Sequence, residues 1–135
     1  MSNTGLGVMI SQLSYRSKNP ADFYGKTISS VFMGENHYGD NFLDIEFTDN
    51  VKIRLRDDGQ SCCEHRYMTC DDDLQALVGN KLEKIEIKDV EYKEGEYGQP
   101  HDIQFLEITT DKGFITIANH NEHNGYYGGF SIIVE

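Results

Sequence analysis

Two stretches decide the fold: Phe42-Leu43-Asp44-Ile45-Glu46-Phe47 and Val51-Lys52-Ile53-Arg54-Leu55-Arg56, which flank Thr48-Asp49-Asn50. In both stretches apolar and charged residues alternate with a period of two, so each forms a strand with one apolar and one charged face. The short polar segment between them is typical of a turn. The sequence therefore predicts a β-hairpin over residues 42–56.

A second hairpin is predicted over residues 102–119, where two further alternating stretches flank Asp111-Lys112-Gly113. A strand is expected before it, through Leu82, Ile85 and Tyr92. The parity of its apolar positions changes between Leu82 and Ile85, which indicates a bulge or a late strand start. A last strand is expected over residues 130–134.

Two helical segments precede the hairpins. The first lies within residues 19–25, with Asn19 as N-cap, Pro20 at the first helical position and Gly25 at the end. A strand over residues 26–33 follows it. The second begins after the acids at 71–73, buries Leu74, Leu77 and Val78, and ends at Gly79.

The two halves of the chain share this order. Phe23-Tyr24-Gly25-Lys26-Thr27-Ile28 parallels Leu77-Val78-Gly79-Asn80-Lys81-Leu82, and each leads through a strand into a hairpin. We interpret the parallel as a degenerate internal repeat; the alternative is that small domains commonly place a Gly-terminated helix before a strand. A repeat would relate the halves by a pseudo-two-fold axis and bring together two irregular loops, residues 57–70 and 120–129.

We expect an α+β fold: one twisted, mostly antiparallel sheet of about six or seven strands with one or two short helices. The chain has 135 residues, a length that suits one domain. Residues 1–18 are expected to be an N-terminal extension and residues 19–135 the domain. Met1-Ser2-Asn3 carries no basic region and no apolar run approaches the length of a membrane span, so neither a targeting signal nor a span is expected. The three cysteines are an odd number and two are adjacent, which argues against a disulfide scaffold and predicts a reducing, cytoplasmic location.

The charge balance excludes some partners. The chain has 12 Lys and Arg against 23 Asp and Glu, a formal charge of −11. Direct binding to nucleic acid or to an anionic membrane needs a basic surface, so neither is expected. Much of the charge lies on alternating strand positions and at a helix start, where it serves folding and solubility.

Cysteine and histidine residues gather in the two irregular loops. Cys62-Cys63-Glu64-His65, Cys70 and His120-Asn121-Glu122-His123 include ligands that zinc prefers, but their spacings are not those of common zinc sites. The nearby acids would raise a thiol pKa, which disfavours a cysteine nucleophile. We expect no metal, no cofactor and no enzyme, with a zinc- or thiol-dependent enzyme as the competing class.

The loop Asn124-Gly125-Tyr126-Tyr127-Gly128-Gly129 has the composition of a binding surface. Its glycines let the backbone approach a partner, and its tyrosines give flat amphipathic area at low entropic cost. The alternative is a simple turn that enters the last strand with one tyrosine in the core.

Taken together, several stretches resemble an uncharacterised family of small single-domain proteins found in bacteriophage and bacterial genomes. They are Gly59-Gln60-Ser61-Cys62-Cys63-Glu64, residues 73–79, residues 110–113 and Asn124-Gly125-Tyr126-Tyr127. Cys-Cys-Glu and Asn-Gly-Tyr-Tyr are the signatures of that family, and the match runs from about Phe23 to Val134. The resemblance implies a viral or mobile-element context, in which small acidic proteins often inhibit host defence.

The leading hypothesis is a non-enzymatic acidic binding protein that inhibits or sequesters a host component by protein contact, its acidic face occupying a basic groove of a nucleic-acid-handling effector. The alternative is a pocket for a small nucleotide-like ligand, in a monomer or across a homo-oligomer. Raising the salt concentration should weaken the first kind of binding steeply and the second little. In both versions the expected binding residues are Gln60, Cys62, Cys63, Glu64, His65, Asn124, Tyr126 and Tyr127.

Overall fold

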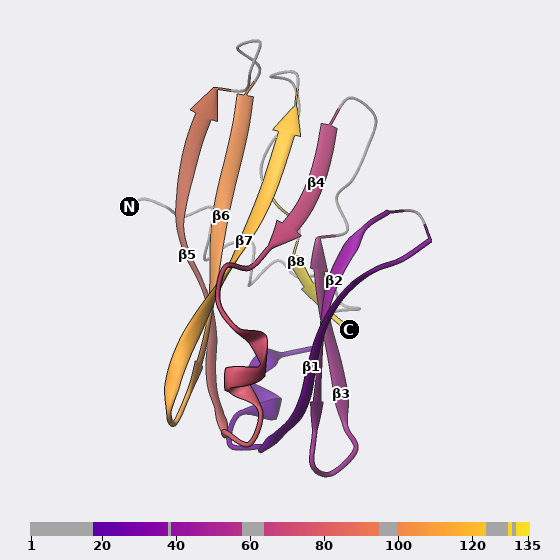
Figure 1. Cartoon of the computed structure of the whole chain (residues 1–135), viewed down its shortest axis with the longest axis vertical. Coiled ribbons are helices and arrows are strands. Elements are labelled where there is room, and N and C mark those ends of the chain that lie inside the picture. Colours follow the sequence, from indigo (N-terminus) through magenta and orange to yellow (C-terminus); the bar gives the residue numbers. More distant parts are fainter. Residues whose placement is uncertain (1–17, 38, 58–63, 95–99, 124–129, 131) are drawn as a thin grey trace.

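The computed structural model describes residues 18–37, 39–57, 64–94, 100–123, 130 and 132–135, with the backbone alone at Glu64 and over residues 89–94. It contains two four-stranded antiparallel sheets, β1-β2-β3-β8 (the first sheet) and β4-β7-β6-β5 (the second sheet), which face each other (Figure 1). The elements, in chain order, are η1 (Pro20–Phe23), β1 (Ile28–Glu35), β2 (Asn41–Phe47), β3 (Lys52–Asp57), β4 (Glu64–Thr69), η2 (Leu74–Leu77), β5 (Leu82–Glu94), β6 (Pro100–Thr110), β7 (Gly113–His123) and β8 (Ile132–Val134).

The expected α+β fold with one sheet is therefore wrong. The described residues form an almost all-β structure of eight strands in two sheets. Two four-residue 3₁₀ turns stand where helices were predicted. Asn19 and Asp73 cap these turns as their positions suggested, but Gly25 and Gly79 follow with φ of +92° and +90° and end them within one turn.

One apolar core lies between the sheets. Alternate residues of β2 and β3, such as Leu43 and Ile53, meet alternate residues of β6 and β7, such as Leu106 and Ile117, and all four are fully buried. The alternation that predicted the two hairpins therefore has the expected origin, since one face of each strand is buried. Val78 is 38% exposed, so its predicted place in a buried stripe is wrong.

The two segments of similar pattern, residues 23–28 and 77–82, lie side by side and exchange backbone hydrogen bonds. Ile28 donates its N–H to Asn80 O, and Leu82 donates its N–H to Lys26 O. Thr27 and Lys81 form an isolated antiparallel bridge between these bonds. A pseudo-two-fold axis at this point relates η1-β1-β2-β3-β4 to η2-β5-β6-β7-β8.

Each half contributes its last strand to the other half's sheet. β4 follows β3 in the chain but pairs with β7, and β8 follows β7 but pairs with β3. The sequence did not predict β4, because Glu64–Thr69 lacks apolar alternation and reads as part of a loop. The bulge expected near the start of β5 is confirmed by a register shift between Leu82 and Lys84.

Candidate functional site

The two halves differ at one end of the second sheet. β5, β6 and β7 have 13, 11 and 11 residues, whereas β1, β2 and β3 have 8, 7 and 6. The register makes Asn119 of β7 equivalent to Asp57, where β3 ends, and β7 continues to His123. In Figure 1 the upper ends of β5, β6 and β7 accordingly stand above the first sheet. We call residues 64–68, 100–104 and 119–123 the polar end.

Histidine is concentrated at the polar end. The chain has five histidines, and four of them lie on β4, β6 and β7 in this region. They are His65, His101, His120 and His123. Since the shorter half has no counterpart to much of this region, folding of the two-sheet scaffold does not by itself account for these residues.

The outer face of the polar end carries a ladder of rings. Tyr67 lies opposite His120 in the register, and their rings stack with centroids 4.4 Å apart and planes 5° apart. The centroid of the His65 ring lies 4.8 Å from that of the Tyr67 ring. Both ring nitrogens of His120 have partners: Nδ1 lies 3.0 Å from His101 Nε2, and Nε2 lies 2.8 Å from Thr69 Oγ1. The ring of His120 is therefore held in one orientation.

The inner face of the polar end is polar as well, although it is buried. Gln104, Asn119 and Asn121 are each at most 1% exposed. Beside them His123 Nε2 lies 2.9 Å from Asp102 Oδ2. Buried amides and ion pairs cost desolvation energy unless they are hydrogen-bonded. Polar side chains at these core positions therefore indicate a role other than apolar packing.

Arg66 connects the polar end to the first sheet. Its guanidinium Nη1 contacts both carboxylate oxygens of Asp57 at the end of β3, at 2.8 and 3.1 Å, and the two side chains are 9% and 10% exposed. Asn41 of β2 adds a second connection by accepting the N–H of Met68 at 2.8 Å. These polar contacts fix β4 against the first sheet.

A small pocket opens beside these connections. It is lined by Asp40, Asn41, Asp57, Arg66, Tyr67, Met68 and Asn119. The side-chain Oδ1 of Asn119 is buried and accepts no hydrogen bond from any described residue. A buried acceptor of this kind is costly to leave unpaired, so it favours a donor from a water molecule or a ligand.

Tyr67 and Cys70 both have raised pKa values. Burial, the hydrogen bond to Glu122 and the charge of that carboxylate raise the pKa of Tyr67 to about 12, so its hydroxyl stays protonated and donates to Glu122 Oε2 at 2.6 Å. Burial raises the pKa of the Cys70 thiol, and neighbouring acids add to the effect. A protonated thiol is a poor nucleophile.

The residues predicted to bind are only partly described. Gln60, Cys62, Cys63, Asn124, Tyr126 and Tyr127 lie outside the described residues. Glu64 is the first residue of β4 and pairs with His123, and His65 is exposed on the outer face.

The strand residues that flank the two predicted loops are paired with one another. Glu64 and His123 pair where β4 begins and β7 ends, and Asp57 pairs with Ile132 where β3 ends and β8 begins. Residues 57–70 and 120–129 were expected to be irregular. This is wrong for 64–69 and 120–123, which are strand.

Several residues of the polar end were missed from the sequence, chiefly Tyr67, His101, Asp102 and Asn119. A signal was present, since polar residues replace apolar ones at alternate positions beyond Ile117 on β7. From the sequence alone the same change predicts the end of the strand.

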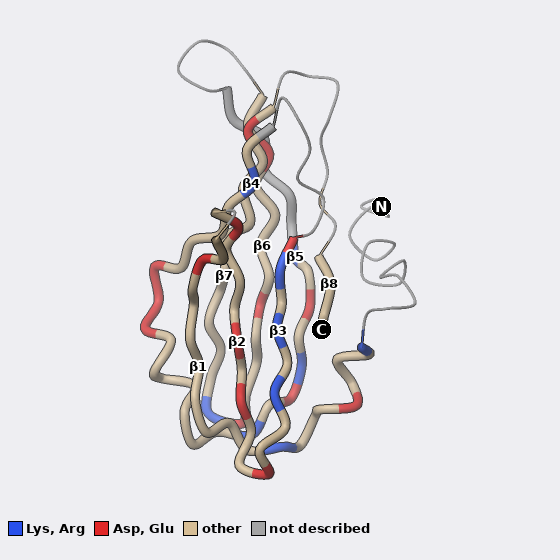
Figure 2. The backbone as a smooth tube through the Cα atoms, turned by 90° about the vertical axis from the view of Figure 1, so that its right-hand side faces the viewer, with Lys and Arg blue, Asp and Glu red and all other residues tan. Residues whose placement is uncertain are grey.

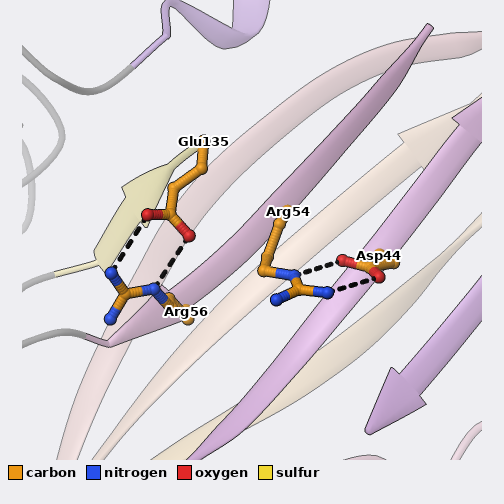
Figure 3. A network of polar contacts seen from close by, with 4 residues as sticks. All are labelled: Asp44, Arg54, Arg56 and Glu135. Atoms are coloured by element: carbon orange, nitrogen blue, oxygen red, sulfur yellow. Dashed lines mark hydrogen bonds and ion pairs between the residues drawn. The ribbon is translucent and has the colours of Figure 1, made fainter. Parts of the chain in front are cut away.

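The arginines on the described strands are all engaged by carboxylates. Arg54 binds both oxygens of Asp44, and Arg56 binds both oxygens of Glu135, with N–O distances of 2.7 to 3.0 Å (Figure 3). Figure 2 shows the basic residues of β3 beside the acidic residues of β2. Because acids outnumber bases in the chain, pairing of this kind leaves an excess of carboxylates that sets the outer field.

The fold and site define a pseudo-symmetric two-sheet β protein with a histidine-rich polar end. Residues 21–133 match the model of a domain of unknown function (DUF7448), and the chain belongs to this family. No curated protein and no solved structure matches the chain. Among the described residues, no helix has the length and apolar character needed to cross a membrane.

Proposed function

We propose that this chain is a non-enzymatic acidic binding protein that inhibits or sequesters a basic protein by direct contact, and that the polar end forms part of the contact surface. The observation that carries the proposal is the ring ladder of the polar end. Flat rings held by hydrogen bonds on rigid strands lose little entropy on binding, which is the property of anchor residues in interfaces.

The charge of the chain supports a basic partner. The excess of carboxylates attracts cationic surfaces over a distance of about one Debye length, roughly 8 Å at physiological salt. In the bacteriophage context that the sequence resemblance implies, the partner would be a component of host defence with a basic groove, and the binding would occur in the bacterial cytoplasm.

Capture of proteins from a bacterial lysate at low and high salt tests the proposal. The matched pair of variants is His65→Ala, at the polar end, and His37→Ala, which also replaces an exposed histidine but lies between β1 and β2. We expect a captured basic protein to be lost with His65→Ala and at high salt, and to be retained with His37→Ala. Equal capture by both variants would contradict the assignment of the polar end.

The alternative of a pocket for a small nucleotide-like ligand gains no support from the described residues, because the pocket beside Asn119 has room for about one water molecule.

A further inference from the structure

Hydrogen bonds from other elements cover parts of all four sheet edges, and β1 keeps the stretch with the least cover among the described residues. Leu82 of β5 bonds to the backbone of Gly25 and Lys26, and Ile85 bonds through both its N–H and its C=O to the Tyr24 hydroxyl. On β4 the N–H of Met68 donates to Asn41 Oδ1, and on β8 the carbonyl of Val134 accepts the N–H of Lys18. An uncovered edge strand is a template for pairing with another chain.

The edge of β1 is covered only over its first half. Ile28 exchanges backbone hydrogen bonds with Gly79 and Asn80, and Val31 O accepts from Gln75 Nε2 at 3.2 Å. Since the C=O of Val31 points away from β2, the alternation of a strand turns the N–H and C=O of Met33 and Glu35 to the same open side. On that side these groups form no hydrogen bond with any described residue.

The internal repeat provides a comparison for this edge. The pseudo-two-fold axis makes Ser30 and Phe32 of β1 equivalent to Lys84 and Glu86 of β5, and Lys88 follows where the register of β5 shifts. Lys84 and Lys88 both contact Glu86, at 3.2 and 2.7 Å. Charged side chains along an edge oppose the addition of a further strand. β1 carries no charge at Ser30 and Phe32 and exposes 61% of Phe32, and its one charged residue is Glu35 at the end of the strand.

Gly34 keeps the outer face of this edge flat. A Cβ atom at Gly34 would lie 2.5 Å from the Phe32 ring and 2.7 Å from the Phe42 ring, so the two rings occupy the space of the missing side chain. The Arg54 guanidinium covers the Phe42 ring at 3.8 Å and is itself neutralised by Asp44. The face formed by Phe32, Gly34 and Phe42 is therefore apolar, and the Arg54–Asp44 pair beside it adds no net charge, whereas Glu35 at the end of β1 is charged.

We propose that the β1 edge pairs in antiparallel fashion with the β1 edge of a second copy of this chain. The two open residues fix the register. Met33 faces Glu35 of the second copy, Glu35 faces Met33 of the second copy, and the two Gly34 residues meet at the two-fold axis. The pairing joins two four-stranded sheets into one of eight strands and brings the two Phe32 rings to either side of the axis.

A second copy fits this edge better than another occupant for two reasons. Antiparallel pairing of two identical edges is isologous, so each hydrogen bond is made twice. Glu35 is the one charged residue of β1, so two acidic chains meet little repulsion along this strand, and a basic partner would gain little there. The paired segment is short, so the dimer forms in a concentration-dependent way.

Sedimentation equilibrium of the full chain over about 1 to 300 μM at physiological salt tests the proposal. We expect the mass to rise from 15.4 kDa toward twice that value. Phe32→Glu should weaken the dimer at least tenfold. Met33→Pro should do the same, because it removes an outward N–H that the fold does not use. Phe114→Glu is the matched control, since Phe114 is 62% exposed at the start of β7, and this variant should dimerise as the unaltered chain does.

Amide hydrogen exchange gives a second readout that does not depend on the variants. The amides of Met33 and Glu35 should gain protection as the protein concentration rises. A chain that stays monomeric over the whole range would overturn the proposal. So would a dimer that Phe32→Glu leaves unchanged, or one that Phe32→Glu abolishes while folded Met33→Pro does not, because that dimer would use the face and not the edge.

Discussion

Gly25 and Gly79 hold equivalent places in the two halves of the molecule, and each bonds to the strand that opens the other half. The N–H of Gly25 donates to Leu82 O at 2.7 Å, and the N–H of Gly79 donates to Ile28 O at 2.8 Å. Both glycines have φ near +90°. This reciprocal contact joins the two repeats at the point where each sheet begins.

Replacing either glycine by alanine should destabilise the fold by about 1 to 2 kcal/mol, because positive φ costs an L-residue that much. No atom lies within 4 Å of a Cβ built at either position, so strain in the backbone is the whole effect. Urea unfolding of Gly25→Ala and Gly79→Ala measures it, and the symmetry predicts similar losses. A loss confined to one variant would show that the two contacts are not equivalent.

The hairpins were predictable because one face of each strand is buried, so apolar and polar residues alternate in the sequence. The pairing of β4 with β7 was not predictable in the same way. On β4 the inner face carries Arg66, whose burial is compensated by Asp57, a residue nine positions away at the end of another strand. A buried ion pair leaves no hydrophobic period, so the sequence of β4 is indistinguishable from a polar loop.

The absence of a local pattern on β4 also explains why only some residues of the polar end could be predicted from the sequence. His65 and Glu64 were singled out as part of a loop motif, and the structure places them on β4. Their neighbour Tyr67 meets His120 only through the strand pairing, which no local pattern encodes. Contacts that depend on register between distant segments need the topology first.

The Arg66–Asp57 pair should be far more sensitive to substitution than the exposed pairs. Removing one partner of a buried pair leaves an uncompensated charge and costs about 3 to 5 kcal/mol. Asp57→Ala should approach that loss in urea unfolding. Glu135→Ala is the matched control: Glu135 and its partner Arg56 are 41% and 27% exposed, and a loss of about 1 kcal/mol or less is expected. Comparable losses in both variants would mean that Arg66 reaches water.

Tyr67 should ionise later than an ordinary tyrosine. Its pKa of about 12 lies above the unfolded value of 10.0 because of burial and the Glu122 carboxylate. The neutral phenol therefore contributes stability that is fully present below pH 10 and is lost as the pH rises through 12. The absorbance difference at alkaline pH between the unaltered chain and Tyr67→Phe isolates this one ionisation. In Glu122→Gln it should move toward lower pH, and an ionisation near pH 10 in the unaltered chain would contradict the buried hydrogen bond.

The hydroxyl of Tyr24 should stabilise the edge of β5 through its hydrogen bonds to the backbone of Ile85. The hydroxyl accepts the N–H of Ile85 at 3.0 Å and lies 3.4 Å from its C=O, so Tyr24→Phe leaves a partly buried donor without this partner and should cost about 1 kcal/mol. The equivalent cover on β1 comes from Gln75, which donates to the Val31 carbonyl. A carbonyl with an unmet bond is tolerated better than an N–H, so Gln75→Met should cost less than Tyr24→Phe. Faster exchange of the Ile85 amide in Tyr24→Phe locates the effect, and an unchanged exchange rate would show that the hydroxyl does not hold this edge.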